Sequence, residues 1–97
     1  MFSQCKKKNG EIEKFDVNKL SKSISLTFKD CGTIHTSYLT DILATAIRDK
    51  IYEDLAEGND SYIPSTDEIA EYTSIALDNC SWDYEARVYL DKRPFKA

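Results

Sequence analysis

The chain is 97 residues long, 41% of them hydrophobic, and its formal net charge is −4. A chain of this length buries one modest core, so we expect a single domain over residues 1–97 and exclude a barrel enzyme. Its acidic balance disfavours a general nucleic-acid binder, which needs a broad basic face.

Positive charge is nevertheless concentrated at the start of the chain. Residues 1–22 contain six lysines against three acids, a net charge of +3, whereas residues 23–97 carry −7. A basic end on an acidic body attracts a compact anion without coating the whole surface for nucleic acid. We therefore expect an anionic ligand near the N-terminal residues.

The cysteines and the N-terminus indicate the cellular compartment. Cys5, Cys31 and Cys80 are an odd number without a Cys-x-x-Cys pair, so we expect buried apolar thiols rather than a disulfide framework or a zinc site. Residues 1–4 lack the apolar core of a signal peptide, and no apolar run approaches the roughly 18 residues that span a bilayer. These features predict a cytoplasmic protein without a membrane segment.

The first ordered element is expected to be a β-hairpin. Asn9-Gly10 is the strongest short signal for a hairpin turn, and it lies between two strand-like runs. Asp16, a good helix N-cap, follows the second run just before an apolar-periodic segment begins. Two short strands are therefore expected to lead straight into a capped helix.

Two amphipathic helices are predicted over residues 17–31 and 37–57, because apolar residues recur at helical spacing in both. Gly32 is expected to end the first helix, and Gly58 to break the second. The inward face of the first helix is predicted to consist of Val17, Leu20, Ile24, Phe28 and Cys31. The inward face of the second is predicted to consist of Leu39, Ile42, Leu43, Ala46, Ile47, Ile51 and Leu55.

Two further helices follow a short extended segment at residues 62–64. Ser65 followed by Glu68 forms a capping-box pattern that starts the third helix, Ser81 is expected to cap the fourth, and Pro94 closes it. Their inward faces are predicted to consist of Ile69, Tyr72, Ala76, Leu77 and Cys80, and of Trp82, Ala86, Tyr89 and Leu90. The predicted fold class is thus α+β, mostly α: a small N-terminal β-hairpin or three-stranded cap on a four-helix cluster.

The hairpin and the first helical turn carry the clearest chemistry. We expect them to bring together five charged side chains: Lys7, Lys8, Glu13, Asp16 and Lys19. Cations suit phosphates, and carboxylates suit ribose hydroxyls or an amino group on a base, so this set predicts a nucleotide pocket without a glycine-rich loop. The lysine run at residues 6–8 also fits a solvated strand edge that blocks aggregation.

Catalysis and metal binding are not expected. No Ser-His-Asp or Cys-His set and no P-loop sequence can be assembled from this chain. The single His35 has no cysteine or acidic partner at ligand spacing, so we expect no metal site.

Three motifs in order carry a family resemblance. They are Lys7-Lys8-Asn9-Gly10 with Glu13-x-Phe15-Asp16-x-x-Lys19-Leu20, then Ile63-Pro64-Ser65-x-x-Glu68-Ile69, then Tyr84-Glu85-Ala86-Arg87-Val88-Tyr89-Leu90 followed by Arg93. Together they resemble the ATP-cone, the regulatory nucleotide-binding module at the N-terminus of ribonucleotide reductase catalytic subunits. The similarity extends from about residue 3 to residue 93 and is weakest between residues 31 and 59.

The resemblance implies roles for nine residues. Lys7, Lys8 and Lys19 would meet the phosphates, with Lys22 in support and Arg93 approaching from the last helix. The backbone at Cys5 would face the adenine edge, Glu13 would accept the adenine amino group, Asp16 would reach the ribose, and Ser65 would hold the sugar or base side. Lys8 stands where an arginine is common in the family, so the bidentate fork of a guanidinium is missing at that phosphate.

The resemblance also implies a function. In that family ATP permits reductase activity and dATP lowers it by changing how the subunits assemble, so ATP or dATP, with Mg²⁺, is the implied effector. The implied partners are reductase catalytic domains or subunits, with self-association as a further possibility. Two alternatives stay open: a free-standing nucleotide-binding regulator or sequestering protein, and a degenerate cone that acts as a protein-interaction module.

Overall fold

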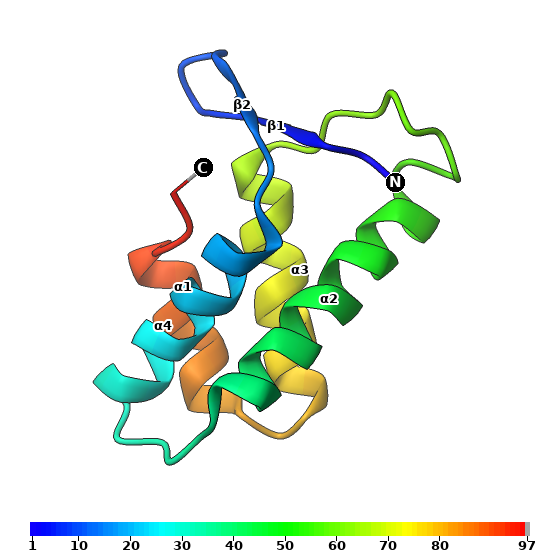
Figure 1. Cartoon of the computed structure of the whole chain (residues 1–97). Helices are drawn as coiled ribbons and strands as arrows, with labels where there is room; N and C mark the ends of the chain where they lie inside the picture. Colours follow the sequence, from blue (N-terminus) through cyan, green and yellow to red (C-terminus); the bar gives the residue numbers. More distant parts are fainter. Residues whose placement is uncertain (97) are drawn as a thin grey trace.

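A two-stranded hairpin caps one end of a four-helix cluster, as Figure 1 shows for the computed structural model, which describes residues 1–96. This confirms the predicted α+β, mostly α fold. The elements in chain order are β1 (Gln4–Lys6), β2 (Ile12–Lys14), α1 (Val17–Asp30), α2 (Ser37–Asp54), α3 (Thr66–Asn79) and α4 (Asp83–Lys92). Along its principal axes the molecule measures 37 × 25 × 19 Å.

The hairpin forms as predicted, but the third strand does not. β1 and β2 pair antiparallel, and Gly10 takes the left-handed conformation, with a φ of 89°, that the tight turn between them needs. The segment before α3 contributes only one parallel bridge, in which the Lys6 N–H donates to the Pro64 carbonyl at 2.9 Å. Pro64 has no N–H to continue a ladder and Thr66 already begins a helix, so pairing stops there.

Local side-chain chemistry fixes where α1 and α3 begin. The Asp16 carboxylate accepts a hydrogen bond from the Asn18 N–H at 2.9 Å and caps α1, as predicted. The capping box of α3 is also confirmed, because the Ser65 hydroxyl accepts from the Glu68 N–H and the Glu68 carboxylate accepts from the Ser65 N–H. Asp16 and Ser65 therefore each have a structural role, as helix caps, before any ligand is considered.

The turn between α3 and α4 departs from the prediction. Ser81 does not cap α4; it takes a left-handed conformation, with a φ of 68°, and Trp82 occupies the cap position without a side-chain cap bond. The Trp82 N–H donates to the Leu77 carbonyl and the Ser81 N–H to the Asp78 carbonyl, the pattern of a Schellman motif that ends α3. Cys80 consequently lies at the end of α3 and is exposed instead of facing inward.

The buried face of α2 is rotated from the predicted one. Ile42 and Ala46 are exposed, whereas Thr40 and Ala44 are buried. Thr40 can lie inside because its hydroxyl accepts a hydrogen bond from the Ser21 hydroxyl of α1 at 2.9 Å. The helix also ends at residue 54, three residues before the predicted end.

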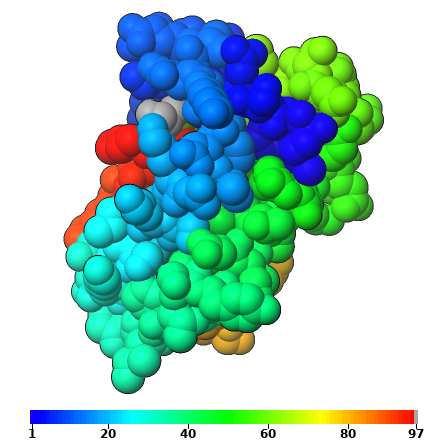
Figure 2. All heavy atoms as spheres, viewed as in Figure 1, coloured from blue at the N-terminus to red at the C-terminus, as the bar shows by residue number. Residues whose placement is uncertain are grey.

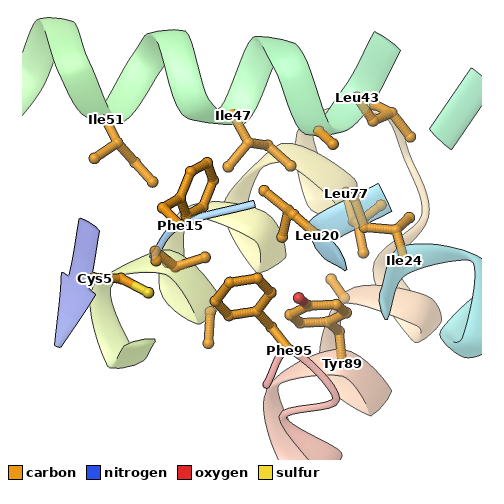
Figure 3. Close-up of a cluster of buried hydrophobic side chains, with 14 of the residues drawn as sticks. Cys5, Phe15, Leu20, Ile24, Leu43, Ile47, Ile51, Leu77, Tyr89 and Phe95 are labelled. Atoms are coloured by element: carbon orange, nitrogen blue, oxygen red, sulfur yellow. The ribbon is translucent and has the colours of Figure 1, made fainter. Parts of the chain in front are cut away.

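All four helices contribute to one buried cluster, part of which is shown in Figure 3. The fully buried side chains include Leu20, Ile24, Phe28, Ile51, Ile69, Leu77 and Tyr89. Of the three cysteines, Cys5 is buried as predicted, but Cys31 is only half-buried and Cys80 is exposed. Within residues 1–96, none of the helices has the length and apolar character needed to cross a membrane.

Candidate functional site

A cleft of about 470 Å³ opens where three segments meet at the hairpin end of the molecule. They are the hairpin turn, the first turns of α3 and the segment that follows α4, and they supply Lys7, Lys8, Asn9, Thr66, Asp67, Ala70, Arg93, Phe95 and Lys96. Figure 2 shows the hairpin (blue) next to the C-terminal segment (red). The volume falls within the range of roughly 300–1,000 Å³ typical of small-molecule sites.

Backbone and aromatic contacts hold these segments in place. The bridge between Lys6 and Ser65 fixes β1 beside the start of α3. The Phe95 side chain is buried, and its ring lies 6.0 Å from that of Phe15, the residue that joins β2 to the cap of α1. The cleft is thus framed by residues far apart in the sequence.

The lining is strongly positive. It contains four cations, Lys7, Lys8, Arg93 and Lys96, against the single acid Asp67. The Arg93 guanidinium donates to the Asp67 carboxylate at 2.9 Å, so one of these cations is paired across the cleft. Excess positive charge in a concave site favours an anionic ligand.

The start of α3 adds a hydrogen-bond donor to this charge. Within residues 1–96, the backbone N–H of Asp67 has no hydrogen-bond partner, because the capping box satisfies only Ser65 and Glu68, whereas the parallel bridge turns the Thr66 N–H toward the Lys6 carbonyl. Thr66 and Asp67 both line the cleft. A free N–H at a helix N-terminus beside several cations is suited to a phosphate oxygen.

Three of the predicted phosphate-binding residues, Lys7, Lys8 and Arg93, line this cleft. Lys7 also forms ion pairs with Glu13 at 3.4 Å and Glu11 at 3.9 Å, both within the hairpin. Since each of these side chains is more than one third exposed, the pairs are weak and a ligand can displace them at low cost.

A second group of predicted residues gathers around the Cys5 thiol and does not line the cleft. Burial raises the pKa of this thiol and the Glu13 carboxylate raises it further, whereas the positive charges of Lys19 and Lys7 lower it. Glu13 is the strand partner of Cys5, and Lys19 is exposed on the first turn of α1. Lys7 belongs to both groups, because it lines the cleft and its charge also acts on the Cys5 thiol.

The remaining predicted residues lie at the edge of these two groups. Asp16 and Ser65 are helix caps, and Ser65 is the residue before the cleft-lining Thr66. Lys22 is exposed on α1 and does not line the cleft.

Sequence reasoning missed Asn9, Thr66, Asp67, Phe95 and Lys96 as cleft residues. Pro94 predicted the end of α4, but the apolar residue immediately after it was the available sign that the chain packs back onto the core. Thr66 and Asp67 follow a predicted N-cap, which is where unpaired N–H groups are expected.

Within residues 1–96, no three His, Cys, Asp or Glu side chains lie close enough to hold a metal ion. His35 instead packs against Phe28, with ring centroids 5.1 Å apart, and its ring nitrogens lie within hydrogen-bond distance of the Ser25 hydroxyl and the Thr33 carbonyl.

Comparison with known proteins identifies the family. The sequence model of the ATP cone domain matches residues 4–96, nearly the whole chain and all three segments of the cleft. No curated protein and no solved structure gives a significant match. The chain belongs to the ATP-cone family, whose members are nucleotide-binding regulatory domains rather than catalytic ones.

Proposed function

We propose that this chain binds ATP and dATP, each with Mg²⁺, and regulates a ribonucleotide reductase by changing how its subunits assemble. The observation that carries the proposal is the cleft in which Lys7, Lys8 and Arg93 lie beside the unpaired Asp67 N–H at the start of α3. This arrangement supplies both the charge and a directed donor of the kind that a polyphosphate requires. Mg²⁺ would be bound through the phosphates, since the hairpin end offers the ion no protein cage.

The adenosine part of the ligand is assigned to the residues around Cys5. Glu13 would accept a hydrogen bond from the adenine amino group, and the backbone of Cys5 would meet the base edge. Glu13 is now paired with Lys7 at 3.4 Å. Ligand binding would therefore replace the ion pair between Lys7 and Glu13. Glu13 would accept from the adenine amino group, and Lys7 would turn to the phosphates. The other lysines assigned to the phosphates are Lys8, Lys19 and the supporting Lys22.

The ribose is assigned to Asp16 and the sugar or base side to Ser65. One Asp16 carboxylate oxygen caps α1 by accepting from the Asn18 N–H, and no hydrogen bond engages the second oxygen within residues 1–96. That second oxygen is suited to accept a ribose hydroxyl. ATP and dATP differ by one ribose hydroxyl, so they can bias an assembly equilibrium only through contacts of this kind.

Calorimetric titration of the chain with MgATP, MgdATP and MgGTP tests the proposal. We expect both adenine nucleotides to bind and GTP to bind much more weakly, because guanine has no amino group at the position that Glu13 would meet. Glu13→Ala should remove this discrimination. Equal affinity for ATP and GTP in the unmodified chain would contradict the adenine assignment.

Two further measurements connect binding to regulation. Lys7→Ala or Lys19→Ala should weaken ATP binding, and the loss should shrink at high salt because screened Coulomb attraction contributes much of it. Light scattering should show a monomer or weak dimer without ligand and different masses with ATP and dATP. Identical masses in all three samples would limit the isolated chain to nucleotide binding.

A further inference from the structure

The segment that follows α4, residues 93–96, forms one wall of the cleft, and two residues set its path. Arg93 has a left-handed backbone, with φ 45° and ψ 62°, and its N–H donates to the Tyr89 carbonyl at 2.8 Å. Pro94 cannot continue a helix. The chain therefore leaves the helix and continues from the end of α4 toward the hairpin, as Figure 1 shows.

One apolar side chain anchors this wall. Phe95 is 5% exposed, and its ring lies 6.0 Å from Phe15, which in turn lies 5.1 Å from Phe2. Figure 3 shows Phe95 pointing into the core beside Tyr89. Arg93 and Pro94 are only half-buried and Lys96 is exposed, so Phe95 is the apolar anchor of the wall, and the Arg93–Asp67 ion pair at 2.9 Å joins the wall to α3.

The Arg93–Asp67 ion pair favours this docking, but repulsion between two unpaired lysines opposes it when no anion is present. Lys8 of the hairpin and Lys96 of the C-terminal segment line the same cleft, and within residues 1–96 no ion pair engages either of them. Like charges in one cleft repel each other, whereas a polyanion between them attracts both. Filling the cleft with phosphates therefore converts a repulsion across it into an attraction.

We propose that residues 93–96 are a ligand-responsive wall of the nucleotide site. Lys96 binds the phosphates together with Lys8, and Phe95 holds the segment where Lys96 can reach them. This inference rests on the proposed function and extends it, because it adds two binding residues and makes the order of the C-terminal segment depend on phosphate occupancy. The effect grows with phosphate number, so ATP fixes the wall more firmly than AMP.

Hydrogen exchange and calorimetry on the full chain test this wall. MgATP should slow exchange of the Phe95 and Lys96 amides, and AMP should slow it less. Lys96→Ala should weaken ATP binding roughly fivefold, the size expected for one exposed ion pair with a phosphate. Phe95→Ala should weaken it further and abolish the protection.

Lys92→Ala is the matched control. Lys92 precedes the wall by one residue, pairs with Asp30 at 3.1 Å and does not line the cleft. Its substitution should leave ATP affinity unchanged. If ATP binds but Lys96→Ala behaves like Lys92→Ala and exchange at residues 95–96 does not change, the wall proposal is wrong while the proposed function stands.

Inorganic tripolyphosphate tests the wall proposal separately from the proposed function in the case in which ATP does not bind. If ATP does not bind, the proposed function fails. Protection of the Phe95 and Lys96 amides by tripolyphosphate would then still support an anion-responsive wall, and lack of protection by either ligand would overturn it.

Discussion

In the helical body the buried polar side chains are paired within the chain, whereas at the hairpin end two of the five charged side chains that line the cleft among residues 1–96 are not. The hydroxyl oxygens of Ser23 on α1 and Tyr89 on α4 lie 2.7 Å apart, within hydrogen-bond distance, and the Thr73 hydroxyl donates to the Ile69 carbonyl within α3. Among residues 1–96, no buried side-chain nitrogen or oxygen lacks a partner. Lys8 and Lys96 of the cleft, by contrast, have no acidic partner in the same range.

This difference separates stability from binding. A paired and buried group costs free energy when it is disturbed, while an exposed cation can take a ligand without first breaking a strong contact. The body therefore sets the positions of the hairpin, the start of α3 and the C-terminal segment, and the cleft between them remains free to exchange partners. Substitutions in the two regions should accordingly change different measurements.

The largest expected effect on folding comes from the centre of the body. Phe28 is fully buried, with its ring 5.0 Å from Trp82 and 5.1 Å from His35. Phe28→Ala should lower the free energy of unfolding by about 3–5 kcal/mol, through lost burial and the cavity left behind. Urea denaturation gives the cost, and calorimetry on the folded protein should give an unchanged ATP affinity.

If the folded Phe28→Ala variant also lost ATP affinity, the inference that the helical body sets stability and the cleft sets binding would be wrong. Ile24→Val is the milder control, since Ile24 is equally buried and the change removes one methyl group, at a cost of about 1 kcal/mol. The two variants should differ in stability but not in binding.

Tyr89 gives the next largest effect, and it depends on pH. Burial raises the pKa of the Tyr89 hydroxyl to about 12, although hydrogen bonds with Ser23 and Thr73 act in the lowering direction. In the unfolded chain the pKa is about 10. Because the folded-state value is the higher one, the neutral hydroxyl favours folding fully below pH 10, and this stability is lost as the pH rises toward 12.

Comparing the unmodified protein with Tyr89→Phe separates the contribution of Tyr89 to the pH dependence of stability from that of the other tyrosines, which titrate in both proteins. At pH 8 the variant should be less stable by about 1 kcal/mol, the value of one hydrogen bond. Between pH 10 and 12 the unmodified protein should lose about 2–3 kcal/mol more than the variant, measured by urea denaturation. Parallel curves for the two proteins would mean that Tyr89 is not a buried, neutral group.

The predictions from sequence held where neighbours in the chain decide the structure. Asp16, Gly32 and the Ser65 box are local devices, and each forms as predicted. The helix periodicity located all four helices, since burial of one face drives each of them.

The predictions failed where packing between elements decides. Ile42 and Thr40 compete for the buried side of α2, and hydrogen bonds from the Ser21 hydroxyl of α1 and to the Ser37 carbonyl make the polar choice favourable. Ser81 was assigned to a cap by residue type, but the Schellman motif places it outside the helix. Phe95 lines the cleft through its contact with Phe15, and although an apolar residue after Pro94 indicates burial, no local pattern identifies a partner so far away in the sequence.

The smallest expected effect on folding belongs to Asp16, where the two regions meet. One of its carboxylate oxygens caps α1 and the other is available to a ribose hydroxyl. Asp16→Ala should remove both roles and cost about 1 kcal/mol of stability. Asp16→Ser should keep the cap, with stability within about 0.5 kcal/mol of the unmodified protein, because serine and aspartate are comparable N-caps.

The serine variant separates the two roles of this residue. Its shorter side chain has one oxygen, which the cap occupies, so the variant should bind ATP and dATP equally while remaining as stable as the unmodified chain. Asp16→Asn is the control, because its amide oxygen can cap the helix while its amino group donates to the ribose hydroxyl, and it should keep both stability and discrimination. If Asp16→Ser still distinguishes ATP from dATP by calorimetry, Asp16 is only a helix cap and the ribose is sensed elsewhere in the cleft.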